Sequence, residues 1–529
     1  MALALELTNC QPARLDEIPQ LGIDEFRDVV LDGVSSGSRL AALFGRPVAP
    51  ASGTAGTEAG ATSTGVRLYA VLANSASGIL AVLSADVGDR YQSLTSECPQ
   101  AHWFEREIAE QWGIKPEGHP WLKPIRFHSS YRAQGVAPAS VPAVATDPFG
   151  RKPDDPILPG VTNFLQTTSE EMHEVAVGPV HAGIIEPGHF RFLCHGENVL
   201  HLEISLGYQH RGVERALVGG PGKRTIHLIE TLAGDTTVGH TMAYCHALEA
   251  LSGTHVPARA QAVRGIALEL ERLANHTGDL GALAGDVGFL PTMSFCGRIR
   301  GDFLNMTAEI CGNRFGRGLV RPGGIGQVVD EGVRESLRTR LAAALKDVTG
   351  AANLLWETPS VMARFEETGA VSREVCEQLG LVGVAARACG VERDVRFEFP
   401  FGIFMVTHIP MSVGSGGDVA ARAYVRWFEI QRSAAFIQEQ LNSLPENGAH
   451  VELGKLANDS IVVSLTEGWR GEICHVAMTS GEGRLAHYKV VDPSFHNWMG
   501  LAMSLRGQQI SDFPLCNKSF NLSYCGHDL

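Results

Sequence analysis

Eleven cysteines are scattered along the 529 residues of this chain, and their spacing decides whether they could bind a metal. Thiolates are soft, strongly donating ligands, and a Cys-x-x-Cys pair lets both sulfurs reach one ion. The sequence contains no such pair, and its closest cysteines are Cys516 and Cys525. An odd number of dispersed cysteines favours reduced thiols over a disulfide framework. We therefore expect no thiolate metal centre in this chain.

Other motifs for chemistry are also missing from the sequence. It has no phosphate loop and no nucleophile–base triad, and the glycine runs 323–324 and 414–417 lack the spacing of a dinucleotide-binding turn. We interpret both runs as turns and predict no nicotinamide site. Acidic residues outnumber lysine plus arginine by 58 to 44, which gives a net charge of −14. Because phosphate binding needs a basic face, this balance argues against a nucleic-acid partner.

The elements that must position any site fall into two groups. Near the N-terminus, Val66–Leu72 and Gly78–Leu83 are strand-like, and a helix is expected over Ala101–Trp112, ended by Gly113. Further along, strand patterns at 175–180 and 190–206 precede long stretches with the helical spacing of apolar residues. Those stretches are Thr241–Leu251, Ala258–Leu283, Val333–Leu354 and Asp418–Leu441.

These patterns predict an α+β protein. We expect a small N-terminal α/β domain over residues 1–130, a proline-rich linker over 131–171, and a large, mainly α-helical domain with a small β-sheet over 172–529. Segments 46–63 and 134–160 are rich in small residues or proline and are expected to be flexible. No basic-then-apolar leader and no apolar run of about 18 residues occurs, so we expect neither a signal peptide nor a membrane span.

The segment His102–Pro120 resembles the signature of the 30-kDa-type subunit of respiratory complex I. In that family the domain is a docking module without a cofactor. We expect its helix to carry Glu105, Arg106 and Glu107 on a solvated face. We interpret His119 as structural, because no second ligand lies at metal-ligand spacing from it.

From Gly178 onward, the chain resembles the large subunit of membrane-bound energy-converting (group 4) nickel–iron hydrogenases and the 49-kDa-type subunit of complex I. The resemblance rests on several segments that occur in the family order. They are Gly178–His181, Glu186–Arg191, Tyr208–Glu214, Glu271–His276, Arg321–Gly324, Gly417–Arg422, Leu505–Gly507 and Asp512–Tyr524. The resemblance implies a 49-kDa-type domain fused to a 30-kDa-type domain.

The hydrogenases of this family hold nickel and iron with an early and a late Cys-x-x-Cys pair. The resemblance aligns the early pair with Ala233 and Thr236 and the late pair with Ser523 and Gly526, while Cys525 lies one residue out of register. Hydroxyl groups are poor nickel ligands beside thiolates, and alanine and glycine offer no ligand at all. We therefore predict that this chain holds no nickel–iron centre.

Asp235 stands between the two early positions, where the family has an uncharged residue. Such a carboxylate needs a partner such as Arg224, Arg211 or a lysine, or its pKa will rise. Asp235, His240 and Cys525 could converge on another metal, but three ligands spread over two segments are weak support for a site. We interpret His240 as a hydrogen-bonded histidine behind the site.

With Asp235, the candidate catalytic residues are His181 and Glu214. The family's quinone-headgroup histidine falls on His181, which could donate a hydrogen bond, and later a proton, to a reduced quinone. The alternative is a structural histidine on a glycine turn. Glu214 falls near the family's buried proton route, where a carboxyl with a raised pKa can shuttle protons. The alternative is an ion pair with Arg211 or Arg215. We interpret three further arginines as core or interface salt bridges: Arg264, Arg396 and Arg422.

The resemblance implies a peripheral subunit of a hydrogenase-like or NADH-quinone-oxidoreductase-like complex on the cytoplasmic face of the membrane. A small iron–sulfur subunit and antiporter-like membrane subunits are the expected partners, and the expected role couples electron transfer to ion translocation. We expect no cofactor bound by this chain itself, apart from a quinone at His181, and an iron–sulfur cluster in the partner. Two alternatives stay open: a non-catalytic structural subunit, and a nickel–iron hydrogenase with unusual ligands.

Overall fold

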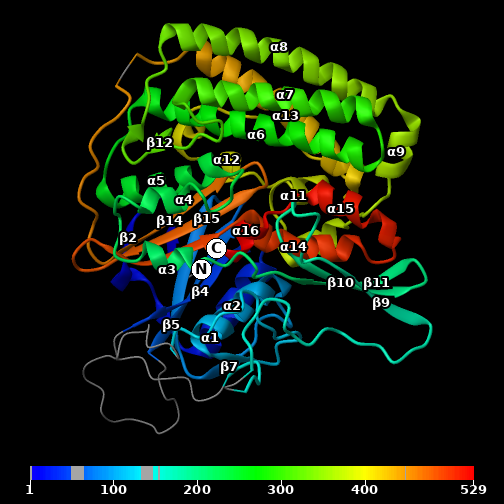
Figure 1. Ribbon diagram of the computed structural model, residues 1–529. Coiled ribbons are helices and arrows are strands. Elements are labelled where there is room, and N and C mark those ends of the chain that lie inside the picture. The colour runs from blue at the N-terminus through cyan, green and yellow to red at the C-terminus, as the bar shows by residue number, and fades with distance from the viewer. Residues whose placement is uncertain (1–2, 49–64, 133–146, 153–154, 447) are drawn as a thin grey trace.

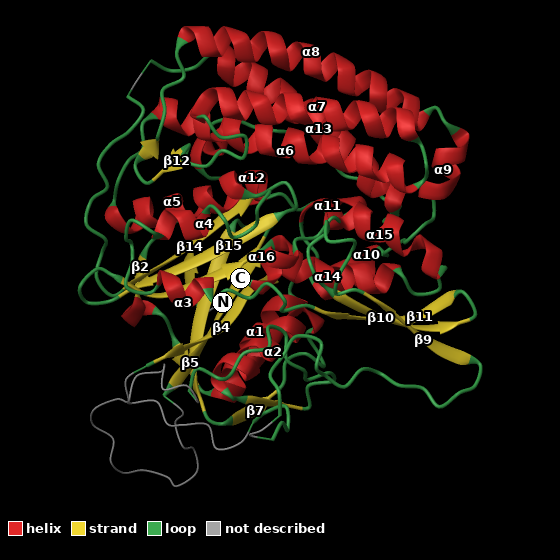
Figure 2. Cartoon of the chain, viewed as in Figure 1, coloured by secondary structure: helices red, strands yellow, loops and turns green. Residues whose placement is uncertain are grey.

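The computed structural model describes residues 3–48, 65–132, 147–152, 155–446 and 448–529 (Figure 1). Most of the two segments that we expect to be flexible, 46–63 and 134–160, lies outside the described residues. Helices and several small sheets alternate along the chain (Figure 2), which confirms the predicted α+β class.

The N-terminal part is a mixed sheet with two helices. Its strands run in the order β1-β6-β5-β4, and β3 pairs in parallel with β6. The sheet is buried on both faces, because α1 packs on one face through Phe26 and Val30 while β4 approaches the large domain, where Phe44 stacks on His487. The elements are β1 (Leu5–Leu7), β3 (Gln20–Leu21), α1 (Ile23–Ser35), β4 (Arg39–Pro47), β5 (Val66–Asn74), β6 (Ile79–Val87), β7 (Arg90–Gln92), α2 (His102–Trp112) and β8 (Lys115–Glu117).

Helix α2 is buried on every side, so the predicted solvated face for Glu105, Arg106 and Glu107 is wrong. Glu105 accepts hydrogen bonds from the loop at 93–95, and Arg106 donates to backbone carbonyls of the segment after the helix. Glu107 reaches the large domain. Because charged groups are buried only when they are paired, three adjacent charges on this helix mark a docked element with partners on each side. The helix ends at Gly113 in the left-handed conformation, as predicted.

The large domain stacks a helix bundle on a second sheet (Figure 1). Helices α6, α7, α8 and α13 form the bundle, which confirms the predicted helix-bundle core. The helices are α3 (Val213–Leu217), α4 (Thr225–Ile229), α5 (Thr237–Ser252), α6 (Ala258–Asp286), α7 (Leu290–Cys311), α8 (Glu331–Trp356), α9 (Pro359–Phe365), α10 (Arg373–Leu379), α11 (Gly383–Ala388), α12 (Val395–Glu398), α13 (Val419–Asn442), α14 (Pro493–Ser504), α15 (Phe513–Phe520) and α16 (Tyr524–Asp528).

Three strand groups complete the large domain. The sheet β16-β15-β14 takes the N-terminal strand β2 at its edge, and a separate antiparallel sheet β11-β10-β9 extends to one side (Figure 2). The glycine run at 323–324 turns the chain between β12 and β13, as predicted. The strands are β2 (Ala13–Arg14), β9 (Met172–Val177), β10 (His189–His195), β11 (Asn198–Ser205), β12 (Val320–Arg321), β13 (Gly324–Ile325), β14 (Ser460–Glu467), β15 (Glu472–Thr479) and β16 (Leu485–Val491). Among the described residues, no helix combines the length and the hydropathy that a bilayer crossing needs.

Candidate functional site

Two turns far apart in the sequence meet at the start of α5. The early turn, Ala233–Thr236, leads into α5, and the late turn begins α16, where the Ser523 hydroxyl caps the helix by accepting from the Gly526 N–H at 2.9 Å. The sulfur of Cys525 lies between the turns: it is 3.4 Å from the Ser523 hydroxyl and near the backbone N–H of Gly234. The four positions that the sequence aligned with metal ligands thus lie together in one buried region between the two turns (the cleft).

The guanidinium of Arg470 lies against the early turn. It binds both carboxylate oxygens of Asp235 at 2.6 and 2.7 Å, and its Nη1 donates to the Thr236 hydroxyl at 3.2 Å. Its Nε donates to the carbonyl of Asn521, just before the late turn. The guanidinium also stacks on the indole of Trp469, 3.9 Å from the ring centroid. One buried cation therefore joins both turns.

Arg470 is the partner that Asp235 required, so the expected pairing with Arg224 or Arg211 is wrong. Arg224 is exposed, and Arg211 donates to two backbone carbonyls instead. Burial raises the pKa of Asp235, but the charge and hydrogen bonds of Arg470 outweigh this effect and hold the pKa below its ordinary value. Asp235 is therefore ionised at neutral pH.

Two glycines place the loop that carries Arg470. A Cβ on Gly383 would lie 2.1 Å from the carbonyl oxygen of Arg470, and a Cβ on Gly471 would lie 2.7 Å from the Cα of Gly383. Both glycines have positive φ, at +64° and +139°. The loop can approach α11 this closely only because neither residue has a side chain.

A cysteine at Gly526 would displace the carboxylate of Asp492. A Cβ there would lie 2.6 Å from the carboxylate carbon of Asp492, whose Oδ2 accepts a hydrogen bond from Nε2 of His240 at 3.0 Å. Burial raises the pKa of the Cys525 thiol to about 12, so this sulfur stays protonated at neutral pH. A nickel–iron group needs four thiolates, and the residues of these turns do not fit it.

His240 does not converge with Asp235 and Cys525 on a metal. Its second nitrogen, Nδ1, lies 3.1 Å from Nε2 of His475, so both ring nitrogens are engaged within the protein. Within the part of the chain that the structure describes, no three histidine, cysteine, aspartate or glutamate side chains are grouped to hold a metal ion.

Comparison with known proteins assigns this arrangement to a family. Residues 286–461 match the family described as respiratory-chain NADH dehydrogenase, 49 Kd subunit, and residues 58–139 match its 30 Kd subunit. The carbon monoxide-induced hydrogenase of Rhodospirillum rubrum is 31% identical over 350 residues, which cover 66% of this chain and 97% of the relative. The chain belongs to the large-subunit family of complex I and its related hydrogenases.

Two further relatives represent the two kinds of complex in which this family occurs. Formate hydrogenlyase subunit 5 of Escherichia coli (strain K12) is 29% identical over 452 residues, which cover 82% of this chain and 76% of the relative. NADH-quinone oxidoreductase subunit 4 of Thermus thermophilus is 28% identical over 370 residues, which cover 65% of this chain and 90% of the relative. The relatives are thus subunits of hydrogenase-related and NADH-quinone oxidoreductase complexes.

In this family member, His181 lies on a loop that reaches the late turn through Glu186. The Glu186 carboxylate accepts the backbone N–H groups of Tyr524 and Cys525, both at 3.2 Å. His181 itself bonds back to its own loop, with Nε2 donating to the carbonyl of Gly188 at 2.8 Å. Because a carbonyl only accepts, Nε2 carries the proton and Nδ1 is the nitrogen left to face a ligand.

Glu214 is paired differently from our expectation. Its carboxylate binds the Lys489 ammonium at 2.9 Å and lies 4.0 Å from Arg126, so the predicted ion pair with Arg211 or Arg215 is wrong. Burial raises the pKa of Glu214, but these two cations outweigh it and hold the pKa below its ordinary value. In this state Glu214 is ionised at neutral pH.

Glu107 of α2 completes this cluster. It binds Lys489 at 2.6 and 2.7 Å and also pairs with Arg126. The cluster therefore contains two carboxylates and two cations, and it joins the N-terminal domain to α3 and β16. This role of Glu107 could be recognised in the sequence only as an unusual run of charges within an apolar helix.

The other arginines considered from the sequence are structural. Arg264 pairs with Glu249, and Arg396 pairs with Asp394 and Glu269, all buried, as predicted. Arg422 differs, because its hydrogen bonds go to the Ser519 hydroxyl and to the backbone carbonyls of residues 369 and 417 rather than to a carboxylate.

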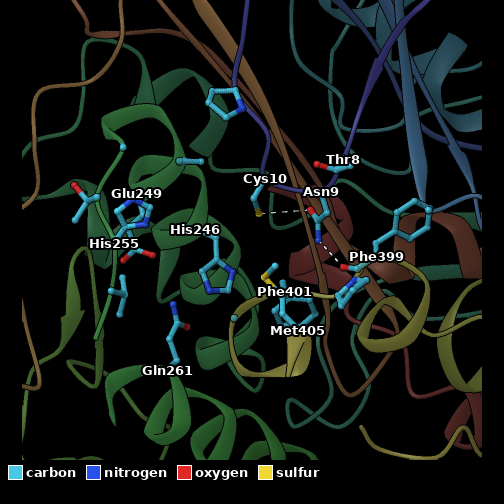
Figure 3. Close-up of a pocket in the computed structure, with 18 of the residues that line it drawn as sticks. Thr8, Asn9, Cys10, His246, Glu249, His255, Gln261, Phe399, Phe401 and Met405 are labelled. Carbon is cyan, nitrogen blue, oxygen red and sulfur yellow. Dashed lines mark hydrogen bonds between the residues drawn. The ribbon is translucent and has the colours of Figure 1, made fainter. Parts of the chain in front are cut away.

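A separate cavity of about 860 Å³ lies at the other end of α5. Figure 3 shows His246, Glu249 and Gln261 on one side of it and Asn9 and Phe399 on the other. A helix rises by about 1.5 Å per residue, so this cavity lies roughly 18 Å along α5 from the early turn. No candidate residue from the sequence lines it.

Proposed function

We propose that this chain is the peripheral-arm large subunit of a membrane-associated redox complex that works without a nickel–iron centre. Its partners are a small iron–sulfur subunit and antiporter-like membrane subunits on the cytoplasmic face of the membrane. The complex couples electron transfer to ion translocation, and this chain provides the cleft at which electrons from the partner's cluster reach their acceptor. Family membership supports the assignment to a redox complex. The residues of the cleft support a reaction that does not use a nickel–iron centre.

The bridging position of Arg470 is the observation that carries this proposal. In a hydrogenase, thiolates surround metal cations at this place. Here the carboxylates of Asp235 and Asp492 act on a guanidinium that joins both turns, and Glu186 adds a third negative charge. An arginine keeps its charge at any relevant pH and exchanges no electrons. The cleft thus retains a cation but loses the site for hydrogen chemistry.

His181 is the proposed contact for a quinone-type acceptor. Nδ1 can accept a hydrogen bond from a quinol hydroxyl, whereas donation to a quinone requires protonation of this nitrogen first. The same loop exposes the apolar side chains of Val180, Ile184 and Ile185, which are 76%, 87% and 44% exposed. Apolar exposure beside a polar ring suits an amphipathic carrier with an aromatic head and a hydrocarbon tail.

A second candidate function is a structural subunit that transmits motion without binding an acceptor. The pairing of Asp235 with Arg470 favours it, because both charges are already satisfied within the chain. The ion pair between Glu214 and Lys489 also favours a structural subunit. In that case the cleft is a closed remnant, and the docking of α2 keeps the two domains in register.

Elemental analysis of the purified, intact complex tests the absence of nickel. We expect iron in the amount of the partner's clusters and no stoichiometric nickel. Bound nickel at one per complex would refute the proposal and favour a hydrogenase with unusual ligands.

Turnover with a water-soluble quinone analogue separates the redox role from the structural role. We expect His181→Ala to lower quinone-dependent turnover by roughly 100-fold if its ring takes part in proton transfer. His195→Ala is the matched control, since this histidine is 58% exposed on β10. Equal turnover of the two variants would favour the structural subunit.

A further inference from the structure

Four buried side chains form a continuous hydrogen-bonded line that starts at the late turn. His240 Nε2 lies 3.0 Å from Asp492 Oδ2, His240 Nδ1 lies 3.1 Å from His475 Nε2, and His475 Nδ1 lies 2.9 Å from the Tyr488 hydroxyl. None of the four is more than 1% exposed. The proposed function uses none of the last three residues, so this line requires its own explanation.

Regular secondary structure aligns these side chains. His240 is on α5, and His475 and Tyr488 are on the neighbouring strands β15 and β16. Tyr488 pairs with Ala477, two residues after His475, so both rings emerge on the same face of the sheet, the face against α5. Tyr244 follows His240 by one helical turn on α5, and its ring packs 6.2 Å from that of Tyr488.

The carboxylate at one end fixes the direction of every hydrogen bond. An ionised carboxylate only accepts, so Nε2 of His240 must donate to Asp492. Nδ1 of His240 is then an acceptor and takes the proton of Nε2 of His475. Nδ1 of His475 is in turn an acceptor and takes the hydroxyl proton of Tyr488. All three donors therefore point toward Asp492.

The line runs from the late turn at its Asp492 end toward the protein surface at its Tyr488 end. Asp492 is held by the Ser494 N–H at 2.8 Å and contacts the late turn at Gly526, while its charge acts on Arg470. At the other end, the ring of Tyr244 packs beside Tyr488, and Thr225, whose hydroxyl accepts from the N–H of Gly222 at 2.8 Å, lies near the Tyr244 hydroxyl. Residues 222–224 are exposed, so this end leads to solvent.

We infer that Asp492, His240, His475 and Tyr488 form a proton relay by which the carboxylate beside Arg470 takes up a proton when negative charge enters the cleft. This inference rests on the proposed function, because the relay responds to an electron that the proposed complex delivers to the cleft. A fully buried charge is costly, and a proton that follows the electron removes that cost.

The transfer balances in charge and atoms. An iron–sulfur cluster of the partner would supply one electron to a quinone-type acceptor held in the cleft, and this chain's residues would supply the matching proton. Asp492 gains the proton of His240 Nε2, His240 Nδ1 gains that of His475, and His475 Nδ1 gains that of Tyr488. Tyr488, left as a tyrosinate, then regains a proton from solvent. The cleft has then taken up one electron and one proton.

The surroundings keep the relay at rest until charge arrives. His240 and Arg470 outweigh burial and hold the pKa of Asp492 below its ordinary value. Burial, and after it His240, hold the pKa of His475 well below its ordinary value although Asp492 acts to raise it, and burial raises the pKa of Tyr488 well above its own ordinary value. The other titratable groups facing Tyr488 are Tyr244, Cys245 and Cys474.

Nitrogen NMR of histidine-labelled protein tests the direction of the line without any turnover. We expect the proton of His240 and that of His475 to lie on Nε2 in both rings, as the hydrogen bonds of the line require. His240→Gln and His475→Gln assign the two signals. An imidazolium, or a proton on Nδ1 of either ring, would overturn the relay.

Proton uptake by the intact complex tests the transfer itself. An indicator dye follows uptake after rapid reduction, and we expect Tyr488→Phe to slow it roughly 100-fold. Tyr69→Phe is the control, since Tyr69 is equally buried but stacks on Phe44 in the N-terminal sheet. Thermal melting checks that both variants fold. Normal reduction with wild-type uptake in Tyr488→Phe would refute the relay alone, whereas a complex that accepts no electrons would refute the relay and the proposed function together.

Discussion

Replacing Glu107 with glutamine should loosen the contact between the two domains. In the wild-type cluster, the charges of Glu107 and Glu214 balance those of Arg126 and Lys489, and each cation is at most 3% exposed. Glu107→Gln leaves one uncompensated positive charge in the interior. Removing one partner of a buried pair costs about 3–5 kcal/mol. Since about 1.4 kcal/mol is a tenfold change in population, the opening of α2 should become more frequent by at least two orders of magnitude.

Native-state amide hydrogen exchange of α2 measures this opening directly. We expect its slowest amides to exchange at least 100-fold faster in Glu107→Gln than in the wild type. The double variant Glu107→Gln/Lys489→Met restores neutrality, because only Glu214 and Arg126 then remain charged. Its exchange should return most of the way to wild type, since neutral replacement of a buried pair is nearly free of cost.

A matched surface variant is the control for this experiment. Arg298 is 52% exposed and pairs with Asp302 on α7, so Arg298→Gln should leave α2 exchange unchanged, as surface pairs contribute about 0–1 kcal/mol. The single variants Glu107→Gln and Lys489→Met should each change the exchange rate of α2. If the effect of the double variant equalled the sum of these two single effects, the electrostatic account of the cluster would be wrong. Shape, and not charge balance, would then hold the domains together.

Three further predictions concern the cleft and the surrounding loops. Gly526→Cys should lower the melting temperature and still bind no nickel in elemental analysis, because its Cβ would lie 2.6 Å from the Asp492 carboxylate carbon; a stable, nickel-loaded variant would contradict this. Gly383→Ala should displace the Arg470 loop and destabilise the fold by more than about 1 kcal/mol in denaturant unfolding, since it combines a positive φ with a backbone clash, and an unchanged midpoint would contradict it. Burial raises the pKa of Glu398 to about 7, so folding favours its neutral form, and stability should fall by up to about 1.4 kcal/mol per pH unit as pH rises from about 4.5 toward 7. Glu398→Gln should flatten this fall in denaturant titrations, and identical pH profiles would refute the assignment.

The sequence predicts the long regular elements well because periodic burial leaves a strong pattern. The expected helix over Ala258–Leu283 is three residues longer at its end in α6, and the expected helix over Val333–Leu354 is two residues longer at each end in α8. Helix α7 was not predicted. Its apolar pattern is interrupted by Gly297 and Gly301 and by a largely exposed surface. The sheet β14-β15-β16 escaped too, because it is buried on both faces and lacks the alternation of a half-exposed strand.

The sequence indicated the two turns of the candidate site but not the side chains that join them. Alignment of motifs placed the early and late turns, and the structure brings them together. Arg470 could not be selected, because pairing between residues 235 and 470 depends on tertiary contact and leaves no local period. The short run Gly468-Trp-Arg-Gly471 was the available signal, as glycines around a charged residue mark a loop that approaches another element closely.

Strand β2 places Ala13 and Arg14 at the edge of a sheet in a distant part of the sequence. Ala13 and Arg14 pair with Ile461 and Ser460 at the open side of β14, so the start of the chain covers hydrogen-bonding groups of a sheet that forms from residues more than 440 positions later. Uncovered backbone of this kind invites intermolecular strand addition. Recombinant versions trimmed at the N-terminus should therefore tend to self-associate, and an affinity tag is placed more safely where it leaves these two residues free to dock.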